Sequence, residues 1–203
     1  MTKTFFLSFL ALLTLAGCLP ESKVEAKIGE MAPNFTGTDS TGSKISLSDF
    51  KGRNVVLEWT NHECPFVKKH YGSGNMQKLQ QKYTEQGVIW LSIVSSAVGK
   101  QGYTSGEEAA AIIKEKGAHA TARILDSSGK IGRLYGARTT PHMFVVSKEG
   151  ILVYAGAIDS DPGFNPEGIK GATNYVADAL ESLAKGEAVK VSATKPYGCA
   201  VKY

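Results

Sequence analysis

Short apolar runs separated by polar turns set the pattern of this chain. Residues 54–60 and 88–94 are β-branched and almost continuously apolar, which is typical of strands buried on both faces. Residues 35–38 and 44–47 flank a glycine-containing turn, and 143–146 and 151–154 flank a second one. The pattern therefore predicts two buried central strands and two hairpins.

A further short strand is predicted at 124–125. Helices are predicted over residues 65–71, 131–135 and 175–183, and two more are predicted to begin at 73–75 and at 105. Pro65 suits a first helical turn, where its missing N–H costs no hydrogen bond. Ser73 or Asn75 is expected to cap the next helix, and Ser105 with Glu108 has the form of a capping box. The element order predicts an α/β fold with a central mixed sheet flanked by helices.

The N-terminal residues have the character of an export signal. Lys3 precedes an apolar run over 5–17 that is too short to span a bilayer as a helix. Residues 15–18, Leu-Ala-Gly-Cys, resemble the lipobox of bacterial lipoproteins, which implies cleavage before Cys18 and lipid attachment to it. The alternative is a plain secretory signal with an incidental Cys18. In either case we expect an exported protein, and the lipobox implies a membrane-anchored lipoprotein on the periplasmic side.

Composition agrees with one globular domain. The 203 residues are 42% hydrophobic and 21% charged, and the net charge of +4 is spread along the chain without a basic stripe, so nucleic acid is not an expected partner. The predicted organisation is a signal, a polar tether, a domain and a C-terminal tail, at residues 1–17, 18–26, 27–188 and 189–203.

Three cysteines define the candidate chemistry. With Cys18 carrying a lipid, Cys64 and Cys199 remain, in a compartment where disulfides persist. A disulfide between them that forms and breaks reversibly would carry out the redox reaction of the protein, whereas a permanent disulfide would only hold the C-terminal tail in place.

The order of elements, with Cys64-Pro65 after the first buried strand and Thr140-Pro141 before the hairpin, resembles the thioredoxin fold. Residues 29–52 resemble the opening of the redoxin superfamily, which comprises alkyl hydroperoxide reductase and thiol-specific antioxidant proteins. The resemblance narrows to a peroxiredoxin-like subgroup through residues 59–67, 139–142 and 197–203. It implies a thioredoxin-like domain that uses Cys64 as a redox-active nucleophile without a cofactor or metal.

Differences from the thioredoxin and peroxiredoxin motifs narrow the reactions that can be expected of Cys64. Val67 stands where thioredoxins have their second Cys, which excludes an internal exchange within the motif. Leu57 and Asn61 stand where peroxiredoxins place a Pro and a Thr or Ser. We therefore expect a thiol oxidoreductase whose substrate is a disulfide or a peroxide, with disulfide exchange or sensing slightly favoured.

Reaction at Cys64 requires its thiolate. A helix N-terminus lowers a thiol pKa, and Lys68, Lys69 and His62 are expected to help, whereas Glu63 opposes them. The alternatives are an inert buried Cys64 and a merely solvated His62.

Substrate contacts are assigned to Trp59, His62, Thr140 and Pro141. The preference of X-Pro bonds alone predicts a trans Pro141. The resemblance instead implies a cis Pro141 facing the reactive Cys, with the Thr140 backbone free to pair with a bound chain. Trp59 is otherwise a core residue, and His142 is expected to be a loop-packing residue.

Cys199 lies in a stretch without helical or strand periodicity, so we expect a mobile tail that brings it to Cys64 as the resolving thiol, with an external thiol reductant resetting the pair. One alternative is a redox-inert scaffold with a structural bridge. Another is a copper carrier using Cys64 and His62 with Cys199 or His142.

Overall fold

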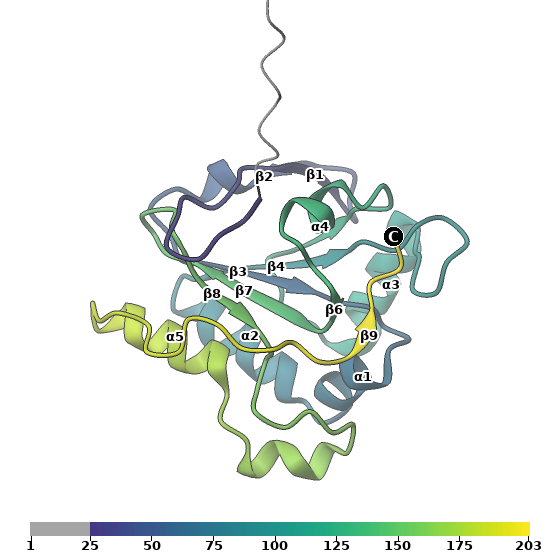
Figure 1. The fold of residues 1–203 in the computed structure, drawn as a ribbon. Helices are drawn as coiled ribbons and strands as arrows, with labels where there is room; N and C mark the ends of the chain where they lie inside the picture. Colours follow the sequence, from purple (N-terminus) through teal and green to yellow (C-terminus); the bar gives the residue numbers. More distant parts are fainter. Residues whose placement is uncertain (1–24) are drawn as a thin grey trace, which may run out of the picture.

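The computed structural model describes residues 25–203 (Figure 1), so the predicted signal, Cys18 and most of the tether lie outside the described residues. A seven-stranded sheet forms its centre, in the order β2-β1-β5-β4-β3-β7-β8. Neighbouring strands are parallel across β3, β4 and β5 and antiparallel elsewhere, which confirms the mixed sheet. The strands are β1 Thr36–Asp39, β2 Lys44–Ser46, β3 Val55–Trp59, β4 Ile89–Val94, β5 Ala122–Leu125, β7 His142–Val146 and β8 Leu152–Gly156.

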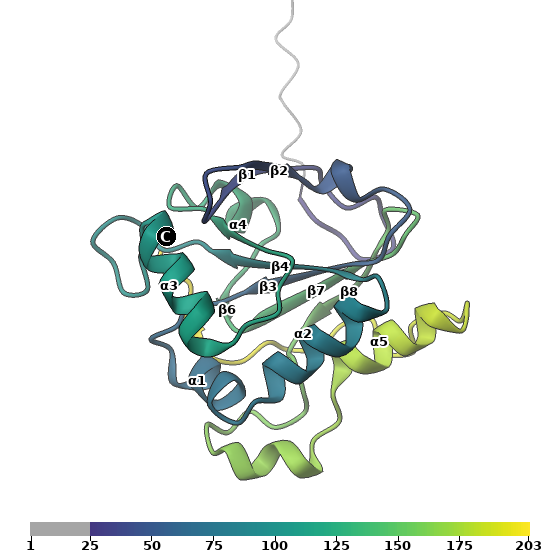
Figure 2. The same cartoon turned by 180° about the vertical axis from the view of Figure 1, so that it is seen from behind.

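Helices cover both faces of the sheet (Figures 1 and 2). One face carries α1 Pro65–Gly72, α2 Asn75–Glu85, α3 Gly106–Lys116 and α5 Tyr175–Ala184, and the other carries α4 Lys130–Leu134. Two 3-10 helices complete the fold, at Leu47–Phe50 and Pro166–Gly171. The predicted capping box of α3 is present, with Ser105 N–H donating to Glu108 at 2.7 Å and Glu108 N–H donating to Ser105 at 3.3 Å.

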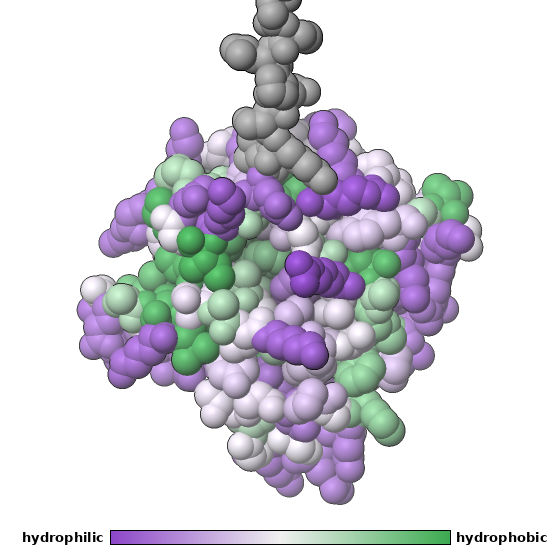
Figure 3. Space-filling view, in the orientation of Figure 1, coloured by the Kyte–Doolittle hydropathy of each residue, from purple (hydrophilic) through white to green (hydrophobic). Residues whose placement is uncertain are grey.

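Two hydrophobic cores lie on opposite sides of the sheet because strand residues alternate between its faces. Every residue of β3 is buried. Leu57 and Trp59 belong to the core under α4, whereas Val56 belongs to the core that contains Cys64. Large apolar residues that remain exposed are scattered, and on the face seen in Figure 3 apolar areas are broken up by charged side chains.

The prediction for the start of α2 was wrong. Its N-cap is Gly74, with φ +74°, and Asn75 is already helical. The short turn after α1 needs a left-handed residue at this point, which glycine supplies without the steric cost of a Cβ. Ser73 instead donates its hydroxyl to the His70 carbonyl at 3.2 Å.

The tail differs from the expected mobile segment. Its strand β9 Cys199–Ala200 pairs antiparallel with β6 Thr139–Thr140, next to the end of the central sheet (Figure 1). Val201 N–H donates to Arg138 at 3.0 Å, and Ala97 N–H donates to Lys202 at 2.8 Å. Backbone pairing over two residues leaves no periodic side-chain pattern, so this strand could not be recognised from the sequence. The boundary at 188 and 189 stays a prediction. Among residues 25–203, no helix is long and apolar enough to cross a membrane.

Candidate active site

Cys64 occupies the N-cap of α1, as its position before Pro65 predicts. Its carbonyl accepts the first helical hydrogen bond from Lys68 N–H at 2.9 Å, and its own N–H donates to Asn61 at 3.0 Å. The side chain is completely buried. Its thiol donates to the Thr140 carbonyl at 3.0 Å, so β6 lies directly against the sulfur.

The Cys64 and Cys199 thiols are free, and the β6–β9 pairing places Cys199 opposite Thr140, whose carbonyl accepts from the Cys64 thiol. Burial alone would raise the pKa of Cys64, but hydrogen bonds from the Cys199 thiol and from the backbone N–H groups of Val67 and Cys199 outweigh it, so the pKa lies below its ordinary value. Burial first, and then the neighbouring Cys64, raise the pKa of Cys199 to about 11. When the pair loses its first proton, Cys64 therefore carries the negative charge and Cys199 keeps its proton.

The chain-pairing edge beside Pro141 is occupied by the tail of the same chain. The Thr140-Pro141 bond is cis, in agreement with the family resemblance and against the general preference. Thr140 is paired with Cys199 in β9. Gly198 precedes this contact with φ +130°, and a Cβ there would overlap the Thr140 carbonyl. Glycine at this position lets the tail approach the site closely.

Two expected activators of Cys64 point elsewhere. Within the described chain His62 makes no hydrogen bond to Cys64; it lines a pocket together with Ile112 and Arg123, where burial lowers its pKa. Lys69 is buried, and its ammonium donates to the Asp161 carboxylate at 2.8 Å and the Gly163 carbonyl at 2.9 Å. Lys68 is exposed. Neither His62 nor Lys69 is directed at Cys64, because the loop before α1 turns His62 into the pocket and the helix turns Lys69 to Asp161; the expected effect of Lys68 stays a prediction.

Trp59 and His142 are core residues here. Trp59 is completely buried, donates to Ser95 at 3.0 Å and packs edge-on against Phe144. The assignment of Trp59 to substrate contact is therefore corrected to a core role. His142 lies over Phe144 with ring centroids 4.4 Å apart, and burial lowers its pKa to about 4. The packing role was expected, but His142 packs as the first residue of β7 and not in a loop.

Aromatic side chains fasten the tail on both sides of Cys199. Tyr197 donates its hydroxyl to Asp159 and accepts from His70 at 3.1 Å, in the tautomer that lets His70 accept from Asn75 at 2.9 Å. Tyr203 donates to the Ala137 carbonyl at 2.7 Å. The tail is thus held by side chains as well as by backbone pairing.

A buried polar row beneath α1 was missed by the sequence analysis. Glu58, Ser92 and Arg123 are in register across β3, β4 and β5, and all three are buried. Glu58 and Arg123 are charged residues inside otherwise apolar strands, and this is the signal that could have identified them.

A copper site is not assembled by the donors named above. No group of three or more His, Cys, Asp or Glu residues within 25–203 is arranged to hold a metal ion. His62 lines the pocket described above, and the His142 ring packs on Phe144.

The chain is similar in sequence to a known protein family and to thiol-disulfide oxidoreductases. The model of the AhpC/TSA family matches residues 28–155. The thiol-disulfide oxidoreductase ResA of Bacillus thuringiensis subsp. konkukian is 30% identical over 135 residues, which are 66% of this chain and 70% of that protein. ResA of Bacillus subtilis is 30% identical over 125 residues, covering 62% of this chain and 64% of that protein.

Solved structures resemble almost the whole described chain. A hypothetical protein from Sinorhizobium meliloti has a TM-score of 0.76 at 25% identity, covering 88% of this chain and 96% of that one. An uncharacterized conserved protein from Geobacillus kaustophilus has a TM-score of 0.73 at 25% identity, covering 87% and 92%. A thioredoxin domain of a thiol-disulfide oxidoreductase from Bacteroides vulgatus, at 23% identity, 64% and 89% coverage and a TM-score of 0.51, shares the fold.

Proposed function

The chain belongs to the AhpC/TSA family and has a thioredoxin-like fold, and from this premise we propose that it is a thiol-disulfide oxidoreductase with Cys64 as nucleophile and Cys199 as resolving thiol. One observation carries the proposal. The β6–β9 pairing holds Cys199 opposite Thr140, whose carbonyl accepts from the Cys64 thiol at 3.0 Å, and in this arrangement the Cys64 pKa is lowered and that of Cys199 is raised. Such a pair has one sulfur prepared to attack and a second positioned to follow it.

The reaction consumes one substrate disulfide. The Cys64 thiolate attacks one sulfur of the substrate, the substrate S–S bond breaks, and the first substrate thiolate leaves and takes up a proton. Cys199 then loses its proton and attacks Cys64 in the mixed disulfide, which releases the second substrate thiol. The protein is oxidised to a Cys64–Cys199 disulfide, the substrate gains two electrons and two protons, and an external dithiol reductant reverses the oxidation of the protein.

The pKa values of the two thiols determine the order in which they react. While Cys64 is an anion, its charge and hydrogen bond raise the pKa of Cys199, in addition to the effect of burial. Once Cys64 is covalently bound to substrate, that charge is gone and Cys199 ionises more easily. Cys199 therefore becomes a nucleophile only after Cys64 has reacted.

A disulfide is the favoured substrate over a peroxide. Leu57 is fully buried in the core, where peroxiredoxins have a Pro. Asn61 directs its side chain to Gln101 at 3.3 Å and to the Glu63 N–H at 2.9 Å, and so gives no hydroxyl to a peroxide at Cys64. A thiol peroxidase, in which Cys64 forms a sulfenate and Cys199 displaces water, is the alternative that a peroxide assay tests.

Access to Cys64 requires movement of the tail. The Cys64 side chain is 0% exposed, and β9 occupies the edge of β6 beside it. An external disulfide therefore reacts only after residues 197–200 have moved away from Thr140, and the tail returns when Cys199 attacks.

Export and a lipid on Cys18 are part of the proposal and place the active site at a membrane surface outside the cytoplasm. Labelling with an alkyne fatty acid tests this. Label is expected on the wild-type protein and not on a Cys18→Ala variant, whereas equal labelling of both would exclude the lipid.

Thiol titration with 5,5'-dithiobis(2-nitrobenzoate) in a Cys18→Ala background tests the roles of the two cysteines. The reduced protein is expected to release two thionitrobenzoate ions, and Cys199→Ser one, with a persistent mixed disulfide on Cys64. Cys64→Ser is expected to lose the fast phase. Undiminished fast release from Cys64→Ser would refute the proposed nucleophile, and a wild-type protein that stops at one ion would refute the resolving role. A Cys64–Cys199 reduction potential below about −300 mV would indicate a structural staple.

A further inference from the structure

A buried guanidinium in the polar row of β3, β4 and β5 has no counter-charge in contact. Arg123 is 4% exposed, and its Nε donates to the Ser92 hydroxyl at 3.3 Å. Within residues 25–203, its terminal nitrogens make no hydrogen bond and no ion pair. A buried charge is costly unless it is paired or fully hydrogen-bonded.

The nearest buried carboxylate is committed elsewhere. Glu58 accepts from the Tyr71 hydroxyl at 2.9 Å, and its other oxygen accepts from Gln80 at 3.0 Å and Trp90 at 2.8 Å. It forms no ion pair with Arg123 within 4.0 Å, although its charge is felt there. The donors of the guanidinium are therefore left for a group outside the described chain.

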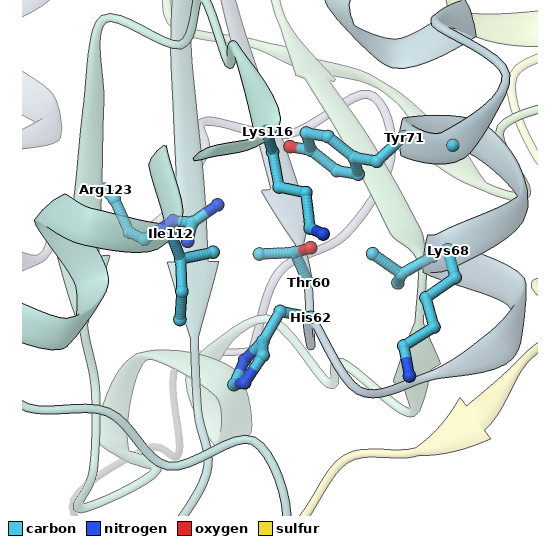
Figure 4. A pocket seen from close by; sticks show the side chains of 9 residues that line it. Thr60, His62, Lys68, Tyr71, Ile112, Lys116 and Arg123 are labelled. Atoms are coloured by element: carbon cyan, nitrogen blue, oxygen red, sulfur yellow. The ribbon is translucent and has the colours of Figure 1, made fainter. Parts of the chain in front are cut away.

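These donors face a pocket between α1 and α3 with a volume of about 150 Å³. Figure 4 shows the Thr60 hydroxyl beside the Lys116 ammonium, with the Arg123 guanidinium extending into the pocket from the opposite side, while the Lys68 ammonium points away. Lys116 is paired with Glu115 at 2.7 Å, but both side chains are substantially exposed, and such surface pairs are weak and exchangeable.

The remaining walls are mainly apolar. Val67 and Ile112 line the pocket, together with the ring of Tyr71. The pocket therefore combines a buried cation in its interior with a hydrophobic lining. A free inorganic anion would use only the first of these features, whereas an organic acid would use both.

We propose that this pocket binds a small organic carboxylate with an apolar body. The carboxylate pairs with the terminal nitrogens of Arg123, which present the planar fork suited to two parallel hydrogen bonds. Lys116 and Thr60 donate to the same group, and the apolar body packs against Val67 and Ile112. The site is separate from the thiol pair and does not depend on the proposed redox function. Val67 connects the two, because its N–H group also bonds the Cys64 sulfur.

Calorimetric titration of the full chain with benzoate, its neutral isostere benzamide and inorganic phosphate tests the site. Benzoate is expected to bind, benzamide not, and phosphate more weakly than benzoate. Arg123→Met is expected to weaken benzoate binding about tenfold or more, since it removes charge-assisted hydrogen bonds. Lys116→Gln is expected to weaken it by about two- to fivefold. Lys114→Gln is the matched control, because Lys114 is exposed on the same helix outside the pocket.

Backbone amide shifts of the wild-type protein keep the test independent of how Arg123→Met folds. Benzoate is expected to move the amides of residues 60–72 and 112–123. Equal binding of benzamide, shifts confined to other regions, unchanged benzoate affinity in a folded Arg123→Met, or phosphate binding tighter than benzoate would each overturn the proposal. Loss of activity in the thiol titration leaves it unaffected, so the two hypotheses fail separately.

Discussion

Replacing Gly198 by Ala should release the tail from the active site. Gly198 lies one residue before the Cys199–Thr140 pairing, and an added Cβ would overlap the Thr140 carbonyl oxygen and lie 2.8 Å from its carbonyl carbon. The backbone φ of +130° is itself unfavourable for alanine. Both effects oppose the docked tail and neither acts on a detached one.

The expected magnitude follows from the strain. A residue with a Cβ in such a backbone region costs about 1 to 3 kcal/mol, before the steric overlap is added. Each 1.4 kcal/mol is about tenfold in an equilibrium constant, so the strain alone should raise the ratio of detached to docked tail by about 5-fold to 140-fold. Cys64 is completely buried when the tail is docked, so its exposure should rise by the same factor.

Alkylation by iodoacetamide, followed at the Cys64 peptide by mass spectrometry, measures this exposure. When docking is fast relative to alkylation, the rate is proportional to the detached fraction. Gly186→Ala is the matched control. Gly186 also has a left-handed φ, of +72°, but a Cβ there meets nothing within 4 Å, and it lies at the end of α5 away from the site.

The reasoning predicts acceleration in Gly198→Ala and a wild-type rate in Gly186→Ala. Equal rates for Gly198→Ala and the wild type would show that the tail does not cover Cys64 in solution. Equal acceleration in both variants would assign the effect to general destabilisation and refute the specific role of the tail contact.

Two further perturbations test the packing around the tail. Tyr197→Phe removes the hydroxyl that donates to Asp159 and accepts from His70, and should lower the free energy of unfolding in urea by about 1 to 3 kcal/mol, whereas a change under 0.5 kcal/mol would contradict the contact. Burial lowers the pKa of His142 from 6.5 to about 4, so the unfolded chain binds its proton first and stability should fall as pH drops through this window, by about 3 kcal/mol in total. Because Glu58 and Asp159 have raised pKa values and titrate in the opposite sense, the test compares the wild type with His142→Gln, whose pH dependence should be shallower in urea unfolding at pH 7 and pH 5.

The sheet and its helices could be predicted because their signals are local. The strands at 54–60 and 88–94 are recognisable by continuous apolar residues, and the α3 start by a capping box, all confirmed. The pairing of β6 with β9 could not be predicted, since it joins two dipeptides about 60 residues apart with no alternating pattern. Such a pairing depends on the docking of a whole segment, which only the assembled fold defines.

For the active site, the place of a residue within a motif or at a helix end was a better guide to its role than its distance from Cys64 in the sequence. Cys64 at the helix cap and its partner Cys199 were predicted, and the structure brings them together. His62 and Lys69 lie within five residues of Cys64 and yet face a pocket and Asp161, because helix and loop geometry send consecutive side chains in different directions. Arg123 was missed because it reaches the neighbouring pocket from β5, a strand far from Cys64 in the sequence, and belongs to no motif around that residue.

One backbone contact both shields Cys64 from solvent and holds the resolving thiol of Cys199 beside it. The Thr140–Cys199 pairing covers Cys64 and also holds the second sulfur beside it. A change that weakens the pairing, such as Gly198→Ala, must therefore speed the first attack on an external disulfide and slow the release of the second substrate thiol. Cys199→Ser keeps the backbone pairing and should leave the first step shielded while abolishing the second. The opposite response of the two steps to Gly198→Ala distinguishes a tail that takes part in the reaction from one that only covers the core.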